Sequence, residues 1–320
     1  MLEKEFGEFY SAIKINDESD ALIEKRKILE NDIRDKFPKI LDSHGIKINK
    51  SDIRIIDQGS YKYKTTIKSK IIDRDVAIII LIDINKYKDT RKLKKYLEEA
   101  IDIPSREVAI KEPCVRAVYR EKGNEWMHID LPLYAEYNDA YYLARGKRES
   151  SEYEWQIADP DGLNKYISDC LTKSDQLRRI ICYIKKWKNE AYANSVRDHE
   201  IPPSIGLTLL ACEYYSNVCH EENDDLNLLL LLMKEIAQRF KKSREYKLPV
   251  QPFSDVFCKM SNTYIENFSK KIYIAVENLE KACCSNNAHV AASYVAKVLG
   301  DEFPVPDDID VIKTRECCFG

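Results

Sequence analysis

Long apolar runs are missing from this sequence of 320 residues. The longest, Val76–Ile82 and Leu228–Met233, are too short to span a lipid bilayer, which takes about 20 apolar residues in a helix. The first ten residues, Met1–Tyr10, carry three acidic side chains and lack the apolar core of a secretory signal peptide. These absences predict a cytoplasmic protein that is not inserted in a membrane.

Cys-x-x-Cys pairs are also absent, although the chain has ten cysteines. Structural zinc sites usually contain such pairs. The cysteines at 283/284 and 317/318 are adjacent in the chain, which is a poor geometry for two ligands of one metal ion. Others, such as Cys182 and Cys212, stand among apolar residues. We therefore predict buried thiols in a reducing compartment, without a disulfide framework or a zinc site.

An excess of positive charge is missing as well, because the net charge at pH 7 is −3. The composition therefore gives no strong signal of nucleic-acid binding. The balance is locally uneven, since the segment from Lys47 to Asp75 holds eight Lys or Arg and four Asp. Such a segment is compatible with a phosphate-facing patch or with an ordinary solvated surface.

The expected secondary structure changes in character near residue 160. Before it, the pattern predicts an amphipathic helix over 19–37 that ends at Pro38, and a buried central strand over Val76–Ile82. It also predicts a helix over 89–100 and strands over 53–56, 107–110, 114–120 and 126–134. After it, helical periods dominate at 162–192, 204–218, 225–241, 262–282 and 286–299.

This order of elements predicts an α+β protein with a mixed sheet in its front part and a C-terminal helical lobe. We expect a catalytic core over 1–160, a helical lobe over 161–300 and an extended tail over 301–320. The tail is rich in Asp and Pro, so we expect it to be poorly ordered and unable to bury apolar surface.

Three acidic residues form the strongest chemical pattern. Asp73 and Asp75 lead into the central strand, and a spacing of two places both carboxylates on one face of an extended chain. They would repel each other strongly unless a cation lies between them, and Mg²⁺ suits hard oxygen ligands. Asp130 lies in a later strand and completes the set if that strand is a neighbour. Three such acids can hold two metal ions about 3.5–4 Å apart.

Gly59 and Ser60 follow a short strand and precede a Lys-rich stretch that contains Thr65 and Thr66. A glycine lets the backbone approach a triphosphate, and the hydroxyl of a serine can donate to its oxygens. A plain turn would explain Gly-Ser alone. The unusual feature is that Gly-Ser is followed along the chain by Thr65, then by the Asp-x-Asp pair, and then by a third Asp in a later strand.

Five segments in this order resemble the cGAS/DncV-like nucleotidyltransferases, which include oligoadenylate synthases and the bacterial CD-NTases of antiphage CBASS systems. The segments are GSYKYKT (59–65), DRDVAIIIL (73–81), HIDLPLY (128–134), RRIICYIKKWK (178–188) and PPSIGLTLL (202–210). The resemblance implies a DNA polymerase β-like nucleotidyltransferase core fused to a helical lobe.

The resemblance also implies a role for each matching residue. Asp73, Asp75 and Asp130 would be the catalytic residues and would bind two Mg²⁺ ions, with Mn²⁺ as an alternative. Gly59, Ser60 and Thr65 would hold the phosphates of the donor nucleotide. Lys185 would reach those phosphates, and Ser204 would touch the nucleotide.

Two neighbours of these acids have simpler interpretations. Arg74 points to the opposite face of the strand and need not disturb the metal ions. His128 is interpreted as a strand residue that faces away from them, with a place on the same face as the alternative.

The expected function is the synthesis of a cyclic di- or trinucleotide from nucleoside triphosphates, with release of pyrophosphate, in antiphage defence. One alternative is a linear nucleotidyltransferase that resembles oligoadenylate synthase or modifies RNA. Another is a catalytically silent nucleotide-binding module, against which the three acids count. Some CBASS operons encode an E1/E2-like ligase that modifies the C-terminus of the synthase. Since the chain ends at Gly320, we expect Gly320 to be a conjugation site.

Overall fold

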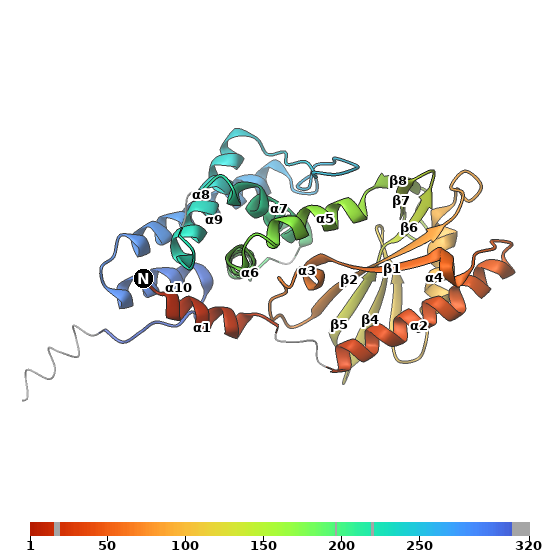
Figure 1. Cartoon of the computed structure of the whole chain (residues 1–320), viewed down its shortest axis with the longest axis horizontal. Helices are drawn as coiled ribbons and strands as arrows, with labels where there is room; N and C mark the ends of the chain where they lie inside the picture. The colour runs from red at the N-terminus through yellow and green to blue at the C-terminus, as the bar shows by residue number, and fades with distance from the viewer. Residues whose placement is uncertain (16–19, 196, 219–220, 309–320) are drawn as a thin grey trace, which may run out of the picture. The chain divides into compact units, whose positions relative to one another are not determined.

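The computed structural model describes residues 1–15, 20–195, 197–218 and 221–308 (Figure 1). These residues pack as two units. The sheet unit comprises Ile15–Ser168 and Leu248–Phe253, and the helical unit comprises Met1–Lys14, Asp169–Lys247 and the chain from Ser254 on. The functional domain boundaries expected from the sequence at 160 and 300 remain a prediction.

The sheet unit is built on one mixed β-sheet. In the described chain this sheet has eight strands in the order β3-β4-β5-β2-β6-β7-β8, and β1 pairs with β2 outside this path. The strands are β1 Ile53–Gln58, β2 Ile72–Leu81, β3 Glu107–Ile110, β4 Val115–Glu121, β5 Asn124–Leu131, β6 Leu133–Tyr137, β7 Ala140–Arg145 and β8 Glu154–Ala158. The sequence did not predict β7 and β8, and it read β5 and β6 as one strand.

Strand β2 is the centre of the sheet because both of its faces are apolar. Ile78 and Ile80 belong to the main core, while Ala77 and Ile79 belong to a smaller cluster with Tyr134. β2 pairs antiparallel with β1 and parallel with both β5 and β6. Pro132 separates β5 from β6, and its carbonyl oxygen accepts from the backbone N–H of Ile78 at 2.9 Å.

Two helices complete the main core of the sheet unit. They are α2 (Asp20–Ser43) and α4 (Thr90–Ile101), which contact each other. The expectation that α2 ends at Pro38 is wrong, because the helix continues for five residues. Phe37 and Leu41 on either side of the proline are fully buried. Their packing offsets the backbone hydrogen bond that a proline removes.

The helical unit contains helices that mostly follow the expected periods. They are α1 Glu3–Ile13, α6 Asp175–Ala191, α7 Ser204–Tyr215, α8 Asp225–Lys242, α9 Asn262–Cys283 and α10 Ala288–Leu299. The single helix expected over 162–192 is two, α5 (Pro160–Leu171) and α6. Ser174 breaks the run, because its hydroxyl accepts from the Gln176 N–H at 3.0 Å and caps the new helix. The sequence analysis missed α1.

The first residues of the expected tail are anchored in the helical unit. The Phe303 side chain is 2% exposed, and its ring centroid lies 5.0 Å from that of Phe6 and 5.2 Å from that of Phe9. Glu302 pairs with Lys186 at 2.7 Å. The expectation that this segment buries no apolar surface is therefore wrong for 301–308. Gly320 lies outside the described residues.

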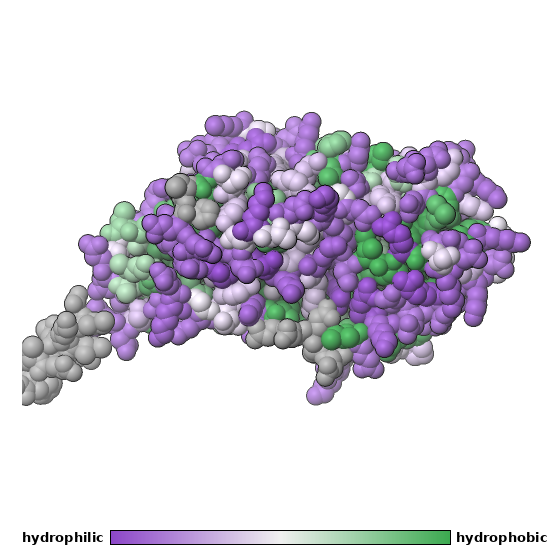
Figure 2. All heavy atoms as spheres, in the orientation of Figure 1, coloured by the Kyte–Doolittle hydropathy of each residue, from purple (hydrophilic) through white to green (hydrophobic). Residues whose placement is uncertain are grey.

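The surface agrees with the charged composition of the chain. The view in Figure 2 is largely hydrophilic, with scattered apolar patches. None of the helices in the described ranges is both long and apolar enough to cross a membrane. The predicted burial of Cys182 and Cys212 is confirmed, since they are 0% and 5% exposed.

Candidate active site

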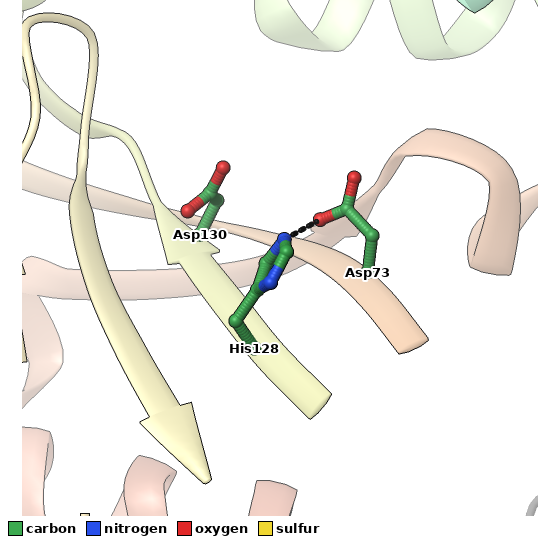
Figure 3. Close-up of side chains that lie close together, drawn as sticks. All are labelled: Asp73, His128 and Asp130. Carbon is green, nitrogen blue, oxygen red and sulfur yellow. Dashed lines mark ion pairs between the residues drawn. The ribbon is translucent and has the colours of Figure 1, made fainter. Parts of the chain in front are cut away.

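The parallel pairing of β2 with β5 brings the predicted acids together. In this register Asp75 lies beside Asp130, and Asp73 lies beside His128. Figure 3 shows Asp73, His128 and Asp130 converging from the two strands. Each of these three offers one ligand atom, and the three atoms lie within 4.8 Å of one another. The structure therefore groups residues that are 55 positions apart in the chain.

The surroundings of Asp75 oppose its ionisation. Its carboxyl is partly exposed but surrounded by protein, and burial raises its pKa to about 7. The neighbouring carboxylates of Asp73 and Asp130 raise this pKa further, while His128 and Arg116 oppose the shift. A cation bound here would remove this repulsion, so the residues fit a divalent metal ion held by oxygen ligands.

His128 faces the acids, so the interpretation that it faces away is wrong. Its Nε2 lies 2.9 Å from Oδ1 of Asp73, and its Nδ1 lies 2.7 Å from Oε1 of Glu125. Burial lowers the pKa of His128, but the carboxylates of Asp73 and Glu125 raise it by more. A spacing of two residues before Asp130 was the signal for this placement, because alternate residues of a strand share a face.

Arg116 is a member of the site that the sequence analysis missed. It lies opposite Asp130 on β4, and its Nε and Nη2 donate to the two oxygens of Asp130 at 2.6 and 2.7 Å. Such a bidentate pair fixes the carboxylate in one orientation. The alternation of apolar and polar residues along β4 could show which face of the sheet Arg116 occupies. That Arg116 meets Asp130 follows only from the register in which β4 pairs with β5.

Gly59 lies directly over Asp75. Its φ is +67°, and a Cβ added to it would meet Oδ2 of Asp75 at 2.2 Å. Only glycine combines this conformation with this closeness. The turn from β1 into the short helix α3 (Gly59–Lys62) therefore brings backbone against the acid cluster.

The residues after Gly59 support the same turn. The Ser60 hydroxyl accepts from the hydroxyl of Thr66 at 2.9 Å, and the Ser60 carbonyl accepts from the Thr65 N–H at 2.9 Å. Thr65 is fully buried. A buried Thr65 can support the loop at Ser60. Its contact with a nucleotide stays a prediction.

Lys185 and Ser204 both lie in the helical unit. Lys185 is 7% exposed on α6, so it is not on a solvated face. The hydroxyl of Ser204 accepts from Nζ of Lys188 at 2.6 Å, and the sequence analysis did not select Lys188. A cavity of about 550 Å³ adjoins this pair and is lined by Lys188, His199, Ile201, Pro202, Pro203, Ser204, Val256, Phe257, Lys259 and Met260.

Comparison with known proteins agrees with this geometry. Residues 53–134 match the nucleotidyltransferase domain described as cyclic GMP-AMP synthase DncV-like. This segment contains β1, β2, β5 and the acid cluster. No curated protein matches the sequence.

Solved structures extend the likeness to most of the chain. The Vibrio cholerae DncV cyclic AMP-GMP synthase with the linear intermediate pppA(3′,5′)pG has a TM-score of 0.75 and 17% identity, covering 93% of this chain and 96% of that one. The same synthase with nonhydrolyzable GTP has a TM-score of 0.71 and 18% identity over the same shares. Escherichia coli DncV bound to 3′-deoxy GTP has a TM-score of 0.72 and 15% identity, covering 93% and 97%.

At these identities the solved structures establish the fold, and the match to the family model is limited to residues 53–134. The predicted fold, a polymerase β-like core fused to a helical lobe, is confirmed. Residues 53–134 match the model of the DncV-like nucleotidyltransferase domain, in agreement with the resemblance found in the sequence.

Proposed function

We propose that the protein joins nucleoside triphosphates into a cyclic di- or trinucleotide and releases pyrophosphate. The observation that carries the proposal is the parallel register that sets Asp75 beside Asp130, with Gly59 over Asp75. Three carboxylates and a close backbone approach are the parts needed for nucleotidyl transfer. The matched Vibrio cholerae synthase, which makes cyclic AMP-GMP, supports the cyclic product.

In the proposed reaction, a ribose hydroxyl of one nucleotide attacks the α-phosphate of another. A new P–O bond forms, the bond between the α- and β-phosphates breaks, and pyrophosphate leaves. For a dinucleotide, a second transfer within the linear product closes the ring and releases a second pyrophosphate; a trinucleotide takes three transfers and releases three. Bound Mg²⁺ ions, or Mn²⁺ ions, would lower the pKa of the attacking hydroxyl and neutralise the charge on the leaving phosphate.

The residues of the site have separate tasks in this proposal. Asp73, Asp75 and Asp130 hold the metal ions, and Asp130 also accepts the proton of the attacking hydroxyl. Arg116 fixes the orientation of Asp130 through its two hydrogen bonds.

Four further residues bind the nucleotide in this proposal. Gly59 and Ser60 hold the donor phosphates through the backbone and a hydroxyl. The resemblance to the family is what assigns Lys185 to the donor phosphates and Ser204 to the nucleotide.

Product analysis tests the proposal. Purified protein is incubated with Mg²⁺ and nucleoside triphosphates, singly and in pairs, and the products are treated with phosphatase before mass spectrometry. Cyclic products have no terminal phosphate and survive unchanged, whereas linear products lose their 5′ phosphates. Linear products alone would identify a linear transferase, and bound but unconverted nucleotide would identify a silent module. The Asp73→Asn, Asp75→Asn double variant is the control, and it should fold but make no product.

We also propose, from the resemblance to CBASS synthases, a role in antiphage defence in the cytoplasm and conjugation at Gly320. Expression with the neighbouring genes should produce adducts of higher mass on the wild-type protein. Deletion of Gly320 or Gly320→Glu should prevent them, because Gly320 is the proposed site of conjugation. Adducts that persist in both variants, or none on the wild type beside an active ligase, would contradict the conjugation.

A further inference from the structure

The Nε2 atom of His128 has an unusual environment. His128 is 9% exposed, and its Nε2 is inaccessible to solvent. The atom that Nε2 faces is Oδ1 of Asp73, at 2.9 Å (Figure 3). A buried polar atom at this distance from a carboxylate oxygen shares either a proton or a cation with it.

The other ring nitrogen of His128 indicates the kind of ligand. Nδ1 lies 2.7 Å from Oε1 of Glu125. If its hydrogen donates to this carboxylate, the neutral ring has its lone pair on Nε2. That lone pair then faces the carboxylate of Asp73, and two acceptors at this distance repel unless a cation joins them. The order carboxylate, histidine, metal is a common arrangement in metal sites.

The surrounding acids offer the remaining ligands. Nε2 of His128 and one oxygen each of Asp73 and Asp130 lie within 4.8 Å of one another. A single ion can therefore reach one nitrogen and two oxygens after small side-chain adjustments. Arg116 donates to both oxygens of Asp130, but a carboxylate has about four lone-pair sites and can accept both Arg116 and a metal ion.

We propose that His128 is a nitrogen ligand of one metal ion in this site, and that the site therefore prefers Mn²⁺ to Mg²⁺. Mg²⁺ binds oxygen ligands almost exclusively, whereas imidazole nitrogen suits transition metals. The inference rests on the proposed function only for the choice of Asp73 and Asp130 as metal ligands. It assigns His128 a role that three acids alone do not require.

Pulsed electron paramagnetic resonance of the Mn²⁺-loaded, full-length protein tests the assignment. The spectrum should show a coupling of Mn²⁺ to imidazole ¹⁴N, and this coupling should change to ¹⁵N when only the histidines are ¹⁵N-labelled. The full chain has five histidines, so variants must identify the one that binds. In His128→Gln the coupling should be lost. In His44→Gln, an exposed histidine stacked on Tyr96 in the same unit, it should persist.

Affinity measurements give a second readout. Loss of the six-line signal of free Mn²⁺ reports binding, and competition with Mg²⁺ reports the preference. We expect His128→Gln to bind Mn²⁺ at least about tenfold more weakly than the wild type, the size of effect seen when the surroundings of metal-bound histidines are changed. Its affinity for Mg²⁺ should be nearly that of the wild type. His44→Gln should retain both affinities. Circular dichroism shows whether each variant folds, and the labelled wild type decides the question if His128→Gln does not.

The proposal is wrong if the wild type binds Mn²⁺ without a histidine nitrogen coupling, because His128 is then an imidazolium that only pairs with Asp73. It is also wrong if the wild type binds no Mn²⁺. This failure is separate from that of the proposed function. Cyclic product made with Mg²⁺ and no nitrogen coupling rejects the ligand alone, and coupling without any product rejects the synthase activity alone.

Discussion

Asp75→Asn is expected to abolish nucleotidyl transfer and, without metal ions, to raise the melting temperature at pH 8. Burial beside two carboxylates raises the pKa of Asp75 from the ordinary 3.8 to about 7. An acid with a raised folded-state pKa holds its proton more tightly when folded, so the free energy of unfolding falls as the pH rises from about 4 to about 7. A difference of about three pKa units lowers the free energy of unfolding of the wild type by at most about 4 kcal/mol. Removing this penalty should raise the melting temperature by several degrees. Asparagine carries no such penalty.

The loss of activity has a separate cause. Without Asp75 the site loses one of its proposed metal ligands. A loss of about 4 kcal/mol of transition-state stabilisation lowers the rate about a thousandfold. Thermal unfolding in EDTA at pH 5 and pH 8, together with product assays, measures both effects. At pH 5 the stability gain should be less than half of that at pH 8, because pH 5 lies only about one unit above the ordinary pKa of 3.8, whereas pH 8 lies above both pKa values.

Asp73→Asn is the matched control for this pair of effects. The Asp73 side chain is 61% exposed, so neutralising it removes no buried charge and relieves only its own share of the repulsion on Asp75. This variant should lose activity with a much smaller gain in stability than Asp75→Asn. An Asp75→Asn protein with wild-type stability in EDTA at pH 8, or with more than about a tenth of the wild-type rate, would contradict the account of Asp75.

Some features of the site could be predicted because they are local. The spacing of Asp73 and Asp75 determines that they share a face of β2 whatever the rest of the fold does. The apolar residues that follow them require a buried central strand. Gly59 could be selected because a glycine before a serine allows a close backbone approach. The pairing of β2 with β5 was left open, and the resemblance to a known family implied only that Asp130 acts together with the other two acids.

The missed features depend on contacts between distant segments. Arg116 meets Asp130 only because β4 and β5 pair in one register, and a slip of one residue would move Arg116 to the other face. Lys185 and Lys188 lie three residues apart on α6, so both are on the same side of the helix. The spacing alone does not show that Lys188 is the one that contacts Ser204. The burial of Phe303 depends on α1, which lies at the other end of the sequence.

The helix boundaries failed for a related reason. Pro38 is a strong local stop signal, but tertiary packing of the flanking Phe37 and Leu41 overrides it. Ser174 is a strong local start signal that was hidden inside a long helical period. Local signals therefore place an element well and its ends poorly, because the ends are decided by packing against the rest of the chain.

Gly59→Ala is expected to reduce nucleotidyl transfer by about a hundredfold or more while the protein stays folded. Two effects act on this variant. An alanine at φ +67° adopts a left-handed conformation that costs about 1–2 kcal/mol. In addition, its Cβ would lie 2.2 Å from Oδ2 of Asp75, so the carboxylate or the loop must move. A displacement of about 1 Å in a catalytic group is enough for a hundredfold loss of rate.

Gly123→Ala separates these two effects. Gly123 has a similar φ of +82° in the same unit, but an added Cβ would have no atom within 4 Å. Both variants should therefore lose a similar 1–2 kcal/mol from backbone strain, whereas Gly59→Ala alone should lose activity and bind Mn²⁺ more weakly. Thermal unfolding, product formation and Mn²⁺ titration of the two variants in parallel make the comparison. If Gly59→Ala matches Gly123→Ala in rate and in metal affinity, the contact between Gly59 and Asp75 has no part in the chemistry. The glycine then serves only the turn between β1 and α3.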